Sequence, residues 1–164
     1  MITPHSILIL GIGQSLRGDD AVGLEVLRLW RKTYPQTAVN PYVRVESAEL
    51  PGLGLIDLLA GADCALLVDA VQSGAAPGTL RLVKLDELLS FESGSGSAHG
   101  WGVAETLALA RQLGETLPEE ISILGIEAQS FEMGAPLSAA VADSLPRAAE
   151  MVEKHIQDWL NVNL

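Results

Sequence analysis

Two adjacent carboxylates, Asp19 and Asp20, follow a glycine turn near the start of the chain. The preceding run Ile7–Ile12 is almost entirely apolar and rich in branched residues, which predicts a buried strand. A glycine turn after a first strand often cradles a phosphate, but here Leu16 takes the place of the third glycine in the dinucleotide motif. Two carboxylates at a helix N-terminus would also repel a phosphate. The pair therefore indicates a metal site or a proton-transfer site.

A structural explanation of the acid pair competes with the chemical one. Asp19 can cap the helix that follows, and Asp20 can be a favourable acid in its first turn. The glycine turn favours a chemical role for Asp20, because it lets the backbone present this residue at the edge of a sheet. We therefore expect Asp19 to be the helix cap and Asp20 to carry chemistry.

Asp69 directly follows the apolar run Cys64–Val68, at the carboxyl end of a predicted central strand. A carboxylate in this position is desolvated unless a group pairs with it. It can accept backbone N–H bonds from the following loop, or it can serve as a metal ligand or a general base. The residues alone leave these two readings open.

His99 follows the Gly/Ser-rich segment Ser93–Ser97 and opens a predicted helix. A lone histidine is more often structural than catalytic, but this one shares a predicted sheet edge with the two aspartates. The other histidines carry less signal, because His5 precedes the first strand and His155 lies in a charged stretch where we expect it to be solvated. Together, Asp20, Asp69 and His99 would form a three-ligand set suited to a divalent metal such as zinc or nickel.

These residues must be positioned by alternating strands and helices. The predicted strands are 7–12, 42–45, 64–70, 79–85 and 120–127. The predicted helices begin near residue 19 and end before Tyr34, and then cover 53–59, 99–113 and 138–160. Such alternation predicts a single-domain α/β fold, spanning 1–164, with a twisted and mostly parallel sheet of about five strands between helices. Ligands of such sheets bind at the carboxyl ends of the strands.

The composition describes an acidic globular protein. Of 164 residues, 48% are hydrophobic and 19% are charged, and the net charge is −11 at pH 7. This charge argues against non-specific nucleic-acid binding and against attraction to anionic membranes, since both require Lys and Arg. The single cysteine, Cys64, lies in an apolar run and indicates a reducing compartment and a small buried hydrophobe. With no signal-peptide pattern at the N-terminus, we expect a cytoplasmic location.

The sequence resembles the hydrogenase maturation endopeptidases, which process the large subunit of [NiFe] hydrogenases. The resemblance runs nearly end to end and rests on segments that keep their order along the chain. These are GIGQSLRGDDAVG at 11–23, VDA at 68–70, PGT at 77–79, SAHGWGV at 97–103 and GIE at 125–127. The opening motif together with the spaced aspartate and histidine is the most specific part.

The resemblance implies an activity and a partner. The family's metal ligands fall on Asp20, Asp69 and His99, with Asp20 and Asp69 as candidate catalytic acids. The activity would be one endoproteolytic cut that removes a C-terminal extension from the large-subunit precursor after nickel insertion. In this reading the ligand set recognises nickel carried by the precursor, and nickel is no permanent cofactor. Either the metal activates the water or a carboxylate acts as general base.

This sequence departs from the family pattern at three places. Gln14 stands for a usual Asn and Ala21 for a frequent Gly, while 46–52 replaces an Asp-Gly-Gly-Thr type of stretch. The last change bears on which precursor is recognised. Two other classes of function stay open at this point: a metal-dependent hydrolase or amidase of small molecules, and a binding module for metalloenzyme assembly that never cuts.

Overall fold

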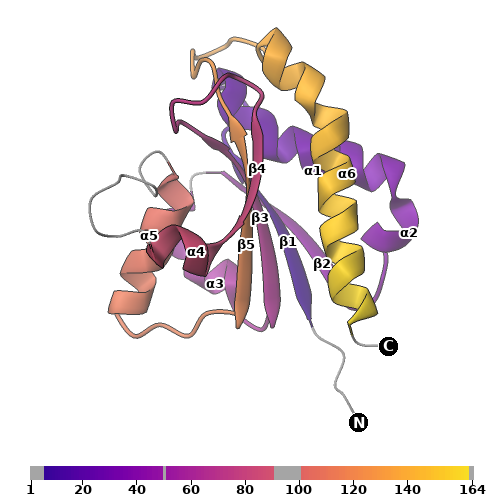
Figure 1. Cartoon of the computed structure of the whole chain (residues 1–164), viewed down its shortest axis with the longest axis vertical. Helices are drawn as coiled ribbons and strands as arrows, with labels where there is room; N and C mark the ends of the chain where they lie inside the picture. The colour runs from indigo at the N-terminus through magenta and orange to yellow at the C-terminus, as the bar shows by residue number, and fades with distance from the viewer. Residues whose placement is uncertain (1–5, 50, 91–100, 163–164) are drawn as a thin grey trace.

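The computed structural model describes residues 6–49, 51–90 and 101–162. Five strands form one sheet in the order β2-β1-β3-β5-β4 (Figure 1). All neighbours run parallel except β4, which is antiparallel to β5. The strands are β1 (Ile7–Gly13), β2 (Val43–Glu49), β3 (Cys64–Val71), β4 (Leu80–Lys84) and β5 (Glu120–Glu127). The predicted α/β fold with a mostly parallel sheet is confirmed.

Helices cover both faces of the sheet (Figure 1). On one face, α1 and α6 enclose a core with β1 and β3, and on the other face α3, α4 and α5 enclose a second core. The helices are α1 (Val22–Thr33), α2 (Pro35–Ala38), α3 (Leu55–Leu59), α4 (Leu85–Ser90), α5 (Gly102–Gln112) and α6 (Ala139–Asn161). Short 3₁₀ turns, η1 (Gly18–Ala21) and η2 (Gly52–Gly54), precede α1 and α3.

The burial of the strands explains why the sequence pattern predicts them well. Every residue of β1 is buried, and β3 and β5 are buried over nearly their whole length. Such strands must be apolar on both faces, so they stand out as continuous apolar runs. The edge strand β2 is only half-buried and extends to Glu49, beyond the predicted end at Val45.

Two short helices fall outside the prediction. Residues Leu85–Ser90 form α4, although the pattern gave only a strand ending at Leu85, and Pro35–Ala38 form α2. Each has too few turns to show a helical period, so its apolar residues look like extensions of a neighbouring element. No helix in the described ranges is long and apolar enough to span a bilayer.

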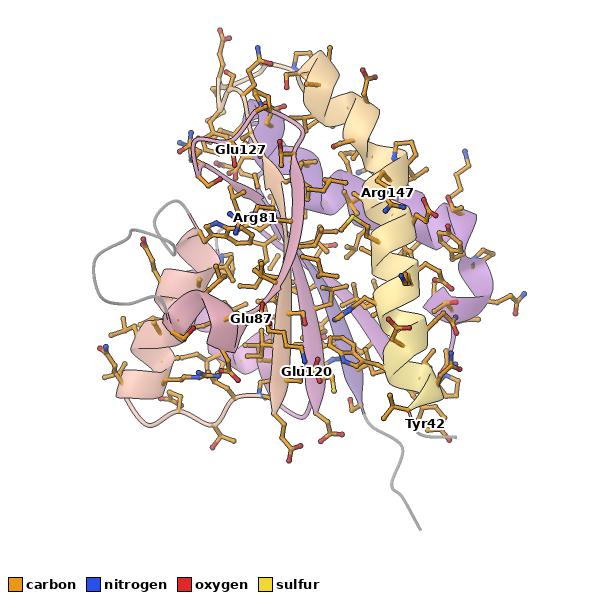
Figure 2. The ribbon with its side chains drawn as sticks, viewed as in Figure 1. Tyr42, Arg81, Glu87, Glu120, Glu127 and Arg147 are labelled. Carbon is orange, nitrogen blue, oxygen red and sulfur yellow. The ribbon has the colours of Figure 1, made fainter. Side chains whose placement is uncertain are left out.

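The parallel strands bring their carboxyl ends to one edge of the sheet. In Figure 2, Glu127 marks that end of β5 and Glu120 marks the opposite end. The Glu127 carboxylate binds the loop after β3: it accepts hydrogen bonds from the N–H and the hydroxyl of Ser73 at 2.9 and 2.7 Å. Glu127 therefore fixes the shape of this edge.

The expectation that His155 is solvated is wrong. Its Nε2 lies 3.0 Å from the Ser122 hydroxyl, and its ring contacts the Trp159 ring with centroids 4.3 Å apart. Burial between α6 and β5 lowers the pKa of the imidazole, against an opposing effect of Glu120 and Asp158. The charged neighbours along the chain concealed this contact, because alternate faces of a helix meet different surroundings.

Candidate active site

Glycines bring Asp20 close to the sheet. A Cβ on Gly13 would clash with the Asp20 carbonyl oxygen, and that same oxygen accepts a bond from the Gln14 N–H at 3.2 Å. Gly23, one turn further on, packs directly against the carbonyl oxygens of Ile12 and Val68. The glycines therefore allow η1 to lie against the ends of β1 and β3, which places Asp20 at the carboxyl edge of the sheet.

Asp19 is not a helix cap, contrary to the sequence prediction. Neither η1 nor α1 has a side-chain cap, and Asp19 is completely buried. Its carboxylate instead accepts N–H bonds from Gln129, Ser130 and Ser138 at 2.8, 3.0 and 2.7 Å, and a hydroxyl bond from Ser138 at 2.9 Å. Burial alone would raise its pKa, but these bonds outweigh burial and lower it. Asp19 therefore joins η1 to the loop between β5 and α6.

The Asp20 side chain, unlike that of Asp19, is partly exposed to solvent. It keeps 15% of its surface exposed, and one carboxylate oxygen lies 4.0 Å from the Arg17 guanidinium. Burial raises the pKa of this carboxyl, with Arg17 acting in the opposite direction. The adjacent acids thus divide their roles: Asp19 is structural, and Asp20 is open to a ligand.

Asp69 is half-buried on β3, between the buried Val68 and Ala70. Its Oδ1 accepts the N–H of Ala70 at 2.8 Å, so it does make a backbone bond of the expected kind. Burial, followed by the negative charge of Asp20, raises the pKa of Asp69 to about 8. The two carboxylates therefore act on each other, and the metal-free pair holds a proton at neutral pH.

Two adjoining hollows open over this carboxylate pair, and Asp20, Asp69 and Gly102 line both of them. The first, of about 180 Å³, is mostly apolar. Its remaining lining residues are Ile12, Gly13, Pro51, Gly52, Leu55, Val103 and Thr106. The second, of about 290 Å³, is more polar and includes Gln72, Glu105 and Phe131. The pair therefore lies where a mostly apolar hollow meets a more polar one.

The sequence prediction did not include the outer members of this surface. Gln72 directly follows the last residue of β3, the strand that carries Asp69, and Glu105 lies in the first turn of α5, the helix that the sequence predicted after His99. Phe131 comes from the loop after β5, which is joined to the site through Asp19. No sequence period marks a loop residue of this kind.

The third predicted ligand, His99, lies outside the described residues. The described ranges contain no group of three or more His, Cys, Asp or Glu side chains that could hold a metal. The structure does bring Asp20 and Asp69 together, and α5, which begins at Gly102, lines both hollows. The ligand roles of these three residues stay predictions.

Cys64 fits the expectation of a small buried hydrophobe. It belongs to the core between the sheet and α1 and α6. It begins β3, at the end opposite to the carboxylate pair. Burial, with the nearby negative charges of Glu120, Asp63 and Glu119, raises the pKa of its thiol to about 11. The thiol therefore stays protonated, and it is not available as a nucleophile at this site.

We predict that Asp69→Asn stabilises the metal-free protein at alkaline pH. The carboxyl pKa is about 8 in the folded protein against an ordinary value of 3.8. The stabilising contribution of the protonated Asp69 is therefore fully present below pH 3.8, and it is lost as the pH rises through about 8. Relative to wild type, the free energy of unfolding of the variant should rise by on the order of 4 kcal/mol between roughly pH 5 and 9, because about three pH units of that range lie below the folded pKa, at about 1.4 kcal/mol each.

Urea unfolding at several pH values measures this difference. The exposed Asp143→Asn is the matched control, because it removes an aspartate from the outside of α6. Parallel stability curves for wild type and Asp69→Asn would show that Asp69 titrates normally.

Comparisons with known proteins identify the family of the chain. A sequence model of the hydrogenase maturation protease family matches residues 28–155, a span that includes Asp69 and begins after Asp20. The hydrogenase expression/formation protein HupD of Rhizobium leguminosarum bv. viciae is 30% identical over 93% of this chain and 75% of HupD. Hydrogenase 2 maturation protease of Escherichia coli strain K12 is 28% identical over 89% of this chain and 87% of its own.

Solved structures carry the same fold. The hydrogenase maturating endopeptidase HybD from Escherichia coli aligns with a TM-score of 0.74 at 27% identity, covering 93% of this chain and 92% of HybD. The fold and its relatives therefore define a peptide-bond hydrolase of the endopeptidase class. The chain belongs to the hydrogenase maturation protease family. The family and the enzyme class that the sequence motifs predicted are confirmed.

Proposed function

We propose that this protein removes the C-terminal extension of a [NiFe] hydrogenase large-subunit precursor once nickel has entered that precursor. Asp20, Asp69 and His99 receive the nickel, which arrives as part of the substrate. The reaction takes place in the cytoplasm. The observation that carries the proposal is the half-buried pair Asp20 and Asp69, which shares two hollows at the carboxyl edge of the sheet.

The donor set fits a borderline divalent metal. Carboxylate oxygens and an imidazole are ligands that nickel and zinc accept, and no thiolate of this chain is available at the edge. Without a metal, the Asp20 and Asp69 pair holds a proton at neutral pH, and this proton would compete with a free ion for the carboxylates. Metal carried by a precursor has its own ligands, so the pair completes a coordination sphere that the substrate has already begun.

The carboxylates also supply what peptide hydrolysis needs. A positive metal next to Asp69 favours its ionised form, so arrival of loaded substrate releases the proton that the empty pair holds. A carboxylate freed in this way can accept a proton from the attacking water, which is general-base catalysis. The buried surroundings strengthen such charge interactions relative to bulk water. Cleavage is thereby tied to the presence of the metal.

The test compares nickel-loaded with nickel-free precursor. We expect the loaded precursor to lose one C-terminal peptide and the nickel-free form to keep its mass, as read by intact mass spectrometry. Equal cleavage of both forms would remove nickel from the proposal. Binding without any change of mass would make the protein an assembly module, and cleavage of small amides alone would make it a small-molecule hydrolase.

A further inference from the structure

Large apolar side chains stand exposed beside the carboxylate pair. Leu16, in the turn before η1, is 69% exposed, and Met133, in the loop after β5, is 65% exposed. Phe131 is in the same loop as Met133, and it lines one hollow together with Asp20 and Asp69. We call Leu16, Phe131 and Met133 the apolar rim.

The apolar rim is held in place by the rest of the structure. The Gly134 N–H donates to the Leu16 carbonyl at 2.8 Å, which fastens the two loops to each other. The Arg17 guanidinium lies 5.3 Å from the centre of the Phe131 ring. The buried Asp19 carboxylate joins the same two loops through the four hydrogen bonds described above. Because these bonds already fix the backbone of both loops, little backbone entropy is lost when a partner covers the apolar rim.

We propose that the apolar rim docks the folded body of the large-subunit precursor around its nickel centre. This inference rests on the proposed function and names the surface through which the same site meets its substrate. A partner that delivers metal to Asp20 and Asp69 must lie over Phe131, which walls their hollow. A small ligand or a short peptide would fill the hollows and leave Leu16 and Met133 in water.

The surroundings of the apolar rim suit a protein partner. Arg17 and the exposed Glu132 flank the apolar side chains, which gives an apolar centre with a charged border. A second copy of this chain is the less suitable occupant, because it would cover the hollows that the substrate must enter. The apolar rim thus provides affinity next to the site, while the carboxylates meet the metal.

The test uses the double variant Leu16→Ser with Met133→Ser. Its matched control is Val39→Ser with Leu113→Ser, since these side chains are also 76% and 61% exposed and lie far from the carboxyl edge. Cleavage of nickel-loaded precursor is followed as its concentration is varied. We expect the half-saturating concentration to rise at least about tenfold in the rim variant, with the maximal rate within about twofold of wild type. The control should match wild type in both.

Separate measurements keep the possible failures apart. Binding of nickel-loaded precursor to immobilised protein reports docking even if no cut occurs. Rim-dependent binding without cleavage would sustain the docking surface and reject the proposed function, whereas normal cleavage and binding by the rim variant would reject the docking surface alone. If wild type were a dimer and the rim variant a monomer, the apolar rim would be a surface for self-association, and the proposal would be overturned. Leu16→Ser alone, checked by thermal melting, guards against misfolding of the double variant.

Discussion

Asparagine in place of Asp20 or of Asp69 is expected to lower the rate of cleavage of nickel-loaded precursor by at least about a thousandfold. The amide keeps the size of the side chain but cannot carry the charge that a metal or an attacking water requires. Both carboxylates line both hollows and the charge of Asp20 acts on Asp69, so we expect them to work as a pair on one metal. The two single variants and the double variant should therefore lose similar amounts of activity, as members of one unit do.

Single-turnover kinetics with excess protein measures this loss, and circular dichroism checks that each variant is folded. Asp143→Asn, on the exposed side of α6, removes the same charge at a position that lines neither hollow and should cleave at the wild-type rate. If either site variant retained more than about a tenth of the wild-type rate, the carboxylate pair would not be the reacting unit.

Alanine in place of Asp19 is expected to destabilise the protein by about 3 kcal/mol, because it leaves buried donors without an acceptor. The carboxylate holds three backbone N–H groups and one hydroxyl at 2.7 to 3.0 Å. Two of these groups, the N–H and the hydroxyl, belong to Ser138, the residue that precedes α6, so the start of the longest helix loses its anchor. The melting temperature should fall by about 10 °C for a chain of this size.

Chemical unfolding of wild type and Asp19→Ala gives this difference directly. The pKa of Asp19 is lowered from 3.8 in the folded protein. Its contribution is therefore present above that pH and is lost as the pH falls through the folded pKa. The difference in the free energy of unfolding between wild type and Asp19→Ala should therefore become smaller in acid. A loss below about 1 kcal/mol near neutral pH would mean that water replaces the carboxylate at little cost.

The carboxyl edge of the sheet could be predicted because local patterns determine it. The strands β1, β3 and β5 are buried on both faces, so their sequences are continuous apolar runs that a reader can count. Once the strands are parallel, a polar residue at the end of each run must lie at the shared edge. That reasoning brought Asp20 and Asp69 together from positions almost fifty residues apart, as the hollows confirm.

The role of Asp19 could not be predicted in the same way. Its partners lie 110 to 119 residues further along the chain, in a loop without any period. Sequence position alone makes an aspartate before a helix look like a cap, because Asp is one of the residue types most favoured at the N-cap. The contact of His155 could not be predicted either, because its partner Ser122 is on β5, a strand that packs against α6 only in the folded protein. Contacts of this range depend on the finished fold.

Anomalous diffraction tests most directly whether the carboxylate pair receives the substrate's metal. The crystals are soaked in a nickel salt above pH 8, where Asp69 has lost the proton that would otherwise compete with a free ion. We expect a nickel peak about 2 Å from carboxylate oxygens of both Asp20 and Asp69, with an imidazole nitrogen of His99 as a further ligand. The peak should disappear in Asp20→Asn crystals. A nickel ion bound elsewhere, with neither aspartate among its ligands, would contradict the account.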